Sequence, residues 1–214
     1  RNKGYGVEYI KLNDAKNAGS FKGEVQRLLK KHSFDQIIVT HPGEYRVLED
    51  IRSWEKEFNV PVEIREDDRF LCSPNAFASW AHNRKQLRME YFYREMRKKY
   101  NILMQGNEPI GGQWNYDAEN RKPPKERLNI PSPYIGKIDA ITEEVLSLVS
   151  ERFKDHFGDL EPFYFAVSRE AAMQVLSQFI EQRFNHFGDY QDAMVEGEPW
   201  MYHSYISFYL NCGL

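Results

Sequence analysis

Segments with strand-like and helix-like patterns alternate between Val7 and Ile64, and this order limits the fold more than any other feature. The expected elements are strands at 7–12, 36–40 and 60–64, a helix that begins at Phe21 and a helix from 45 to 58. Strands separated by helices pair in parallel through right-handed crossovers. An α/β open parallel sheet is therefore expected. Because three strands make a small sheet, we expect further strands upstream of Arg1.

Residues just after the second expected strand have two interpretations. Ligands of open α/β sheets bind at the carboxyl ends of strands, which is where His41, Glu44 and Tyr45 lie. The same segment also suits a helix start, with Pro42 in the first turn and Glu44 near the positive end of the helix dipole. We favour the helix start, whose helix directs Val47, Leu48, Ile51 and Trp54 inward.

A strongly basic helix is expected from 84 to 100, after a shorter one that begins at Ser73. At helical spacing, one stripe on it is expected to be core: Met89, Phe92, Tyr93, Met96 and Tyr100. The stretch contains seven basic and two acidic residues, although the whole chain has a net charge of -3. This helix is either a footprint for a phosphate backbone or a solvated face, and the pattern alone does not decide between them.

The segment from Gly111 to Arg121 is too polar for a core and has too many large, specific side chains for a flexible linker. We expect a neighbouring domain or a ligand to order it. Glycines and prolines without periodicity surround it and mark a domain boundary. The expected domains are an α/β domain at 1–105, an interdomain loop at 106–138 and a helical domain from 139 to 214.

Helical patterns continue from Asp139 onward. Thr142 is expected to cap a helix with the stripe Val145, Leu148, Val149 and Phe153. Ser168 is expected to cap a second helix that buries Ala172, Val175, Leu176, Phe179 and Ile180. The sequence His-Phe-Gly-Asp occurs at 156–159 and again at 186–189, and we interpret it as glycine helix ends followed by aspartate caps, with no metal site.

Few signals identify the chemistry directly. Ser204 and Ser207, near an expected helix start, suit an anion such as a diphosphate, although ordinary caps have the same pattern. Two distant cysteines, Cys72 and Cys212, indicate neither a disulfide framework nor a zinc site and fit a reducing compartment. No apolar run is long enough to span a bilayer. We interpret the chain as a piece of a longer protein that is monomeric, cytoplasmic and not bound to a membrane.

Four segments of the chain resemble one known family. Residues 203–213 resemble the flavin-diphosphate segment of photolyases and cryptochromes, usually Thr-Ser-x-Leu-Ser-Pro-Tyr-Leu-x-x-Gly, with His203 in place of Thr and Phe208 in place of Pro. The segments 84–97, 111–121 and 187–194 are similar to the bacterial photolyase-related proteins that carry an iron-sulfur cluster. The resemblance covers essentially the whole chain.

This resemblance implies an α/β antenna domain followed by an all-α FAD-binding domain, both incomplete here. It implies FAD, a ribityllumazine antenna chromophore and a [4Fe-4S] cluster, with the antenna pocket mostly upstream of Arg1 and the cluster cysteines beyond Leu214. FAD contacts carried over from the motif are His203, Ser204, Ile206, Ser207 and Leu210. We assign no metal ligand to this chain. Because the resemblance also places most of the flavin pocket downstream of Leu214, we expect that the 214-residue piece binds flavin poorly and repairs nothing.

The implied substrate is UV-damaged DNA with a (6-4) photoproduct. Asp117 and Arg121 match loop residues that help place the damaged DNA, and Asp192 matches an acidic residue at the lesion. Further DNA contacts are expected from the same loop and from the basic helix: Trp114, Asn120, Arg84, Lys85 and Arg88. The alternatives are an i,i+4 ion pair between Asp117 and Arg121, and a helix-supporting role for Asp192.

The implied reaction is driven by light and uses no side-chain nucleophile, because reduced FAD donates an electron to the lesion and the protein supplies position and electrostatics. Two other classes stay open. A cryptochrome-type photoreceptor has the same fold and flavin without repair, and a helical interaction module would have lost the cofactor. The preserved motifs argue against the module.

Overall fold

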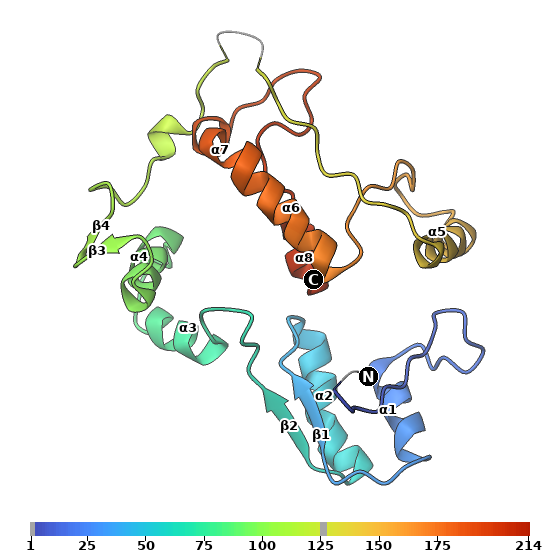
Figure 1. Cartoon of the computed structure of the whole chain (residues 1–214). Coiled ribbons are helices and arrows are strands. Elements are labelled where there is room, and N and C mark those ends of the chain that lie inside the picture. Colours follow the sequence, from blue (N-terminus) through green and yellow to red (C-terminus); the bar gives the residue numbers. More distant parts are fainter. Residues whose placement is uncertain (1–2, 125–127) are drawn as a thin grey trace. The chain divides into compact units, whose positions relative to one another are not determined.

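The computed structural model describes residues 3–124 and 128–214, so residues 125–127 of the expected loop and the first two residues lie outside the described part. The chain forms two compact units, Arg1–Met104 and Gln105–Leu214 (Figure 1). Each unit has its own buried residues.

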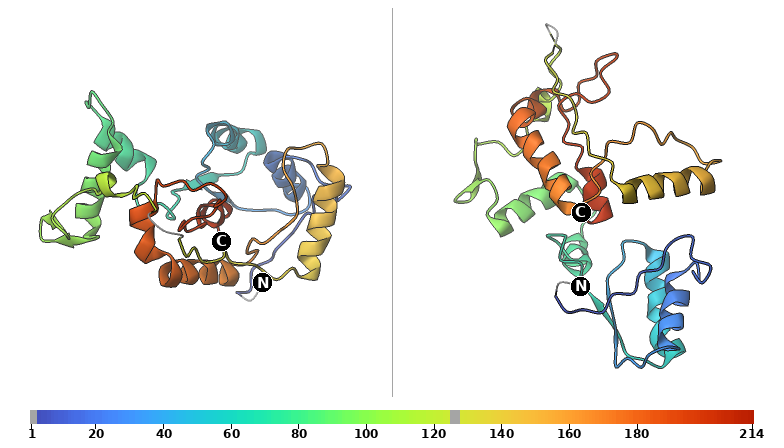
Figure 2. Two further views of the ribbon diagram at one scale, coloured as in Figure 1. Left: turned by 90° about the horizontal axis from the view of Figure 1, so that it is seen from above. Right: turned by 45° about the vertical axis from the view of Figure 1, so that its right-hand side comes forward.

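The first unit begins with the expected α/β order. Its elements are α1 (Phe21–Leu29), β1 (Ile37–Thr40), α2 (Tyr45–Phe58), β2 (Val62–Arg65), α3 (Pro74–Ala81) and α4 (Met89–Tyr100). Strands β1 and β2 pair in parallel, with Ile37 opposite Val62 and Thr40 opposite Arg65. Helices α1 and α2 contact each other and α2 contacts β2 (Figures 1 and 2). The mixed α/β class with parallel pairing is thereby confirmed.

Helix α2 supplies the best-buried side chains of this unit. Leu48, Ile51 and Trp54 are buried, with only 2% of Trp54 exposed, as the helical spacing predicted. Burying each such side chain stabilises the fold by roughly 1.5–3 kcal/mol. Trp54 also donates a hydrogen bond from its indole nitrogen to Asp50 Oδ2 at 3.2 Å. Helix α2 therefore holds its position against the sheet mainly through one apolar face.

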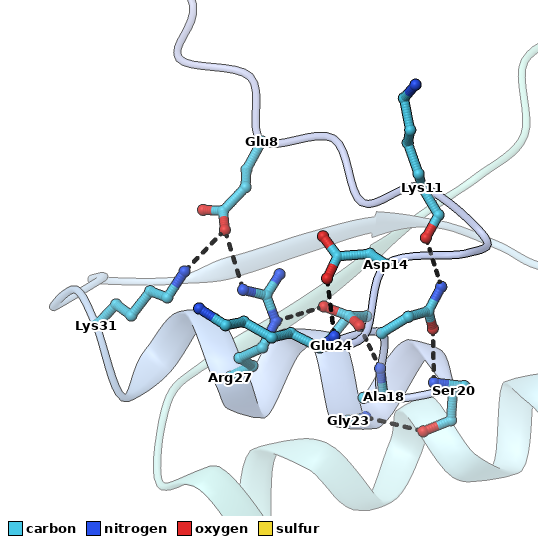
Figure 3. Close-up of polar contacts among 12 residues, drawn as sticks. Glu8, Lys11, Asp14, Ala18, Ser20, Gly23, Glu24, Arg27 and Lys31 are labelled. Carbon is cyan, nitrogen blue, oxygen red and sulfur yellow. Dashed lines mark hydrogen bonds and ion pairs between the residues drawn. The ribbon is translucent and has the colours of Figure 1, made fainter.

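The prediction of a strand at 7–12 is wrong. An alternating pattern forms a strand only where a neighbouring strand accepts its backbone hydrogen bonds, and no strand in the described part of the chain pairs with this segment. Tyr9 is 80% exposed. Figure 3 shows the segment running alongside α1, where Glu8 contacts Arg27 at 3.2 Å and Lys31 at 3.1 Å. The segment is thus attached by charge instead of by a sheet.

The basic helix is shorter than predicted and its apolar stripe is not core. Helix α4 begins at Met89, after an irregular stretch from 84 to 88, and Met89 is 68% exposed. Phe92 is half-buried and packs against Phe77 and Trp80 of α3, with ring centroids 5.3 and 5.0 Å away. Arg97 is the buried residue of this helix and donates to the backbone carbonyls of the turn that follows.

The second unit is mainly helical. Strand β3 (Met104–Gln105) pairs with β4 (Glu108–Pro109) at the boundary in the sequence, and η1 (Asp117–Glu119), α5 (Ala140–Arg152), α6 (Arg169–Gln182), α7 (Phe184–Tyr190) and α8 (Ser207–Cys212) follow. Its core contains Ala166, Ala172, Val175 and Tyr209. The Tyr209 hydroxyl accepts a hydrogen bond from the backbone N–H of Ala166 at 3.2 Å, which connects α8 to the segment before α6.

Helix boundaries in this unit differ partly from the expectation. Ser168 caps α6 as predicted, but Asp139 and not Thr142 caps α5, because Asp139 accepts from both the N–H and the hydroxyl of Thr142. Val145 on α5 is 49% exposed, so its stripe is not buried as a whole. Gly188 lies inside α7, so the prediction that it ends a helix is wrong.

Candidate functional site

An open pocket of about 570 Å³ lies in the second unit, between the loop around η1 and the end of α7. Its lining comes from two segments that are far apart in the sequence: Asp117, Ala118, Asn120 and Arg121 from the loop, and Gln191 and Asp192 from the stretch after α7. Four of the residues predicted for the lesion site therefore surround one pocket, and Gln191 is a lining residue that sequence reasoning missed.

The loop begins with a sharp turn at two glycines. Gly111 and Gly112 have φ of 87° and 75°, a region that side chains with a Cβ rarely adopt. The Tyr116 hydroxyl donates to the Gly111 carbonyl at 3.3 Å, and η1 starts at the next residue. Trp114, predicted to contact DNA, is half-buried and does not line the pocket. The turn thus brings Asp117 and Arg121 to the pocket within a short distance along the chain.

Backbone and side-chain contacts attach this loop to α7 (Figure 1). The N–H of Asp192 donates to the Asn120 carbonyl at 3.0 Å, and the N–H of Lys122 donates to the Asp189 carbonyl at 2.9 Å. Lys122 Nζ also lies 2.7 Å from Asp189 Oδ1. The hydrogen bond that the Lys122 side chain donates to the Asp189 carboxylate is the main cause of the raised pKa of Lys122. No local pattern in the sequence indicated this pair.

The charged groups of the pocket are accessible to a ligand. Arg121 Nη2 lies 3.8 Å from Asp192 Oδ2, and the two side chains are 75% and 44% exposed, so their pairing is weak. Asp117 forms no ion pair with Arg121 within the described residues. A guanidinium in this position can bind a phosphate through two parallel hydrogen bonds, while the carboxylates can accept from N–H or O–H groups.

The predicted basic DNA contacts belong to the first unit and are partly engaged already. The Arg84 guanidinium lies 4.5 Å over the Trp80 ring and pairs with Glu95 at 2.9 Å. Arg88 donates to the Gln86 side chain, whereas Lys85 is exposed and has no partner within 3–124 and 128–214. Since some of these basic side chains already bind other residues of the chain, fewer of them are available to bind phosphate groups than the sequence suggests.

The residues predicted to contact FAD surround the start of α8. Ser204 and Ile206 are half-buried, whereas His203, Ser207 and Leu210 are exposed. Neither serine hydroxyl has a hydrogen-bond partner in the described part of the chain. The centroid of the His203 ring lies 5.8 Å from that of the Phe187 ring. Hydroxyl and imidazole donors suit the oxygens of a diphosphate, so the donor set fits this part of FAD.

The described residues do not offer a site for an iron-sulfur cluster. They contain no group of three or more His, Cys, Asp or Glu side chains that could hold a metal, and Cys72 and Cys212 are both free thiols. In the same part of the chain, no helix combines the length and the apolar character needed to cross a membrane.

Comparisons with known proteins agree with the motifs. The family model described as deoxyribodipyrimidine photo-lyase-related protein matches residues 1–165. A (6-4) photolyase from Agrobacterium fabrum is 48% identical over 214 residues, which is 100% of this chain and 42% of that protein. An uncharacterized protein of Acanthamoeba polyphaga mimivirus is 27% identical over 97 residues, 44% of this chain and 50% of that protein. The chain spans half or less of these relatives.

Proposed function

The chain belongs to the deoxyribodipyrimidine photo-lyase-related protein family, and we propose that the full-length protein is a light-driven DNA repair enzyme. Its reaction class is that of a photolyase-type lyase acting on (6-4) pyrimidine photoproducts. The 48% identity to a (6-4) photolyase extends over the whole of this chain. We also propose that the full-length protein binds damaged DNA and uses a flavin to act on this lesion.

The observation that carries the proposal is the pocket that Asp117, Asn120, Arg121 and Asp192 line together. A damaged base pair is poorly stacked, so an enzyme can extrude the lesion into a pocket at modest cost. The exposed Arg121 guanidinium would hold the phosphate beside the extruded nucleotides. Asp117 and Asp192 would accept hydrogen bonds from the N–H and O–H groups of the lesion.

Residues before and within α8 would hold the diphosphate of FAD. Ser204 and Ser207 supply hydroxyl donors and His203 an imidazole, while Ile206 packs against the core and fixes the backbone at this point. Reduced flavin, when bound and excited by blue light, supplies the electron for the rearrangement. The protein residues bind and orient the lesion and supply no nucleophile. We propose no described residue as a ligand of an antenna chromophore or of a metal cluster.

Blue-light repair of an oligonucleotide with one (6-4) photoproduct tests the proposal on the full-length protein. We expect repair that stops in the dark and falls about tenfold or more with Asp117→Ala or Arg121→Ala, since each removes a charge-assisted contact to the lesion. Lys137→Met, at an exposed lysine of the same segment, is the control for charge loss. Flavin content measured for every variant separates a binding defect from a lost cofactor.

One result would contradict the proposed activity, and another would contradict only the proposed lesion site. A protein that holds a photoreducible flavin but repairs nothing would favour the cryptochrome-type photoreceptor. Repair that is unchanged in both alanine variants would retain the photolyase but remove the pocket as the lesion site.

A further inference from the structure

We propose that Lys122 and Asp189 are positioning residues that lock the loop carrying Asp117 and Arg121 beside Asp192. The inference rests on the proposed function and concerns the same pocket. Neither residue lines the pocket, so both would act through the loop and not by touching the substrate.

Two backbone hydrogen bonds define the lock. One runs from the N–H of Lys122 to the Asp189 carbonyl at 2.9 Å, and the other runs in the opposite direction, from the N–H of Asp192 to the Asn120 carbonyl at 3.0 Å. Residues 120–122 therefore lie side by side with residues 189–192. Arg121, between the two bonded loop residues, is brought to within 3.8 Å of Asp192 by this pairing.

The side chains of Lys122 and Asp189 add an ion pair to the backbone hydrogen bond between the same two residues. Lys122 Nζ lies 2.7 Å from Asp189 Oδ1, immediately beside the backbone bond of the same two residues. An ion pair that joins residues already held by a backbone hydrogen bond loses less conformational freedom than an isolated pair. Both side chains are about half exposed, so salt screens the pair and its loss need not unfold the unit.

Without the pair, the loop should move away from α7 part of the time. Arg121 and Asp117 would then be placed correctly for only a fraction of the molecules, and apparent affinity falls by that fraction. The affinity for DNA that contains the lesion should therefore fall. The affinity for undamaged DNA should not change, because it does not depend on the placement of Arg121 and Asp117. The lock thus predicts a selective defect.

The test uses the full-length, flavin-containing protein with Lys122→Met, Asp189→Asn and the charge swap Lys122→Asp with Asp189→Lys. Dissociation constants are measured for a (6-4) oligonucleotide and for the same undamaged sequence. We expect Asp189→Asn to weaken lesion binding about two- to fivefold, the range that an exposed ion pair supports. The swap should recover most of this loss. Asp155→Asn and Lys137→Met are matched charge controls on exposed residues.

The aspartate variant is decisive because simple electrostatics predicts the opposite sign. Removing a negative charge near DNA strengthens binding of both oligonucleotides if the lock has no role. Equal or tighter lesion binding by Asp189→Asn would therefore overturn the proposal. Failure of the swap to recover affinity, when both single variants are impaired, would also overturn it.

Hydrogen exchange separates this inference from the proposed function. The amides of Lys122 and Asp192 donate the two lock bonds, so peptides covering 117–124 and 189–194 should exchange faster in both single variants than in the wild type. Unchanged exchange refutes the lock whatever the DNA results show. Faster exchange in variants of a protein that does not distinguish lesion DNA would keep the lock and refute the proposed function.

Discussion

Burial and a nearby arginine both affect the pKa of Tyr205. Its hydroxyl donates to the backbone carbonyls of Trp200 and Met201, the latter at 3.3 Å, and its ring faces the Arg183 guanidinium at 5.3 Å. Burial raises the pKa of Tyr205 from 10.0 to about 12, although the positive charge of Arg183 acts in the opposite direction. Desolvation of the phenolate therefore outweighs the attraction of the arginine.

The raised pKa predicts a loss of stability at alkaline pH. Between pH 10 and about 12 the folded state holds the Tyr205 proton that the unfolded chain releases, so this contribution is complete below pH 10 and is lost as pH rises. Urea unfolding should show a steeper fall of the unfolding free energy for wild type than for Tyr205→Phe. At neutral pH the variant should be about 1 kcal/mol less stable, because it lacks the hydroxyl hydrogen bond.

Tyr9→Phe removes the same hydroxyl from a ring that is 80% exposed and is the matched control for this measurement. The prediction fails if Tyr205→Phe and Tyr9→Phe change the alkaline slope by the same amount.

Side chains from the helical part of the second unit hold the irregular segment that follows the pocket-lining loop around η1. Arg183, at the junction of α6 and α7 and only 2% exposed, donates to the Pro131 carbonyl at 2.9 Å and also to that of Ser132. The Tyr202 hydroxyl donates to the Asn129 carbonyl at 3.1 Å. These contacts give an order to the segment that its own backbone pattern does not supply.

Replacing Arg183 should therefore destabilise the second unit. Arg183→Met leaves two carbonyls without their donor, and we expect a loss of about 2–4 kcal/mol in urea unfolding. Arg183→Lys keeps the charge but not the planar group that reaches both carbonyls and the Tyr205 ring, so we expect an intermediate loss. Arg169→Met, at an exposed arginine that starts α6, is the control, and a loss no larger than in this control would contradict the prediction.

Elements with strong local signals could be predicted from the sequence. The apolar face of α2 and the serine cap of α6 follow from residues within one or two turns. The segment 7–12 could not be assigned in this way, because its outcome depends on ion pairs between Glu8 and α1 that its alternating pattern does not reveal (Figure 3). The start of α4 was misplaced because a run of basic residues fits a helix and an irregular stretch equally well.

The residues of the candidate site could be selected from the sequence, but their arrangement around one pocket could not be predicted. Family motifs singled out Asp117, Arg121 and Asp192 separately, and the structure places them around one pocket. No pattern indicated the contact between Lys122 and Asp189, because this contact joins segments that are distant in the sequence. Long-range pairs of this kind depend on how the loop docks and leave no local periodicity.

Whether the 214-residue chain can act alone depends on how much of the cofactor site it contains. Cofactor sites enclose most of their ligand, roughly 70–90% of its surface for a molecule of drug size. The FAD contacts expected here come from one short segment, in which Leu210 is 67% exposed, and the chain corresponds to 42% of the (6-4) photolyase that it matches. Contacts to the diphosphate alone, as proposed, would leave the isoalloxazine and adenine rings without a binding surface in this segment.

We therefore expect the full-length protein to keep FAD through gel filtration, with the visible absorption of bound flavin, and the 214-residue chain to lose it. Ser204→Ala with Ser207→Ala in the full-length protein should lower flavin occupancy, since both diphosphate donors are removed. Ser147→Ala, on α5, controls for the loss of a hydroxyl elsewhere in the unit. Flavin that stays bound to the shorter chain would show that residues within it already form most of the pocket, and the site would then have to be sought among α5 to α8.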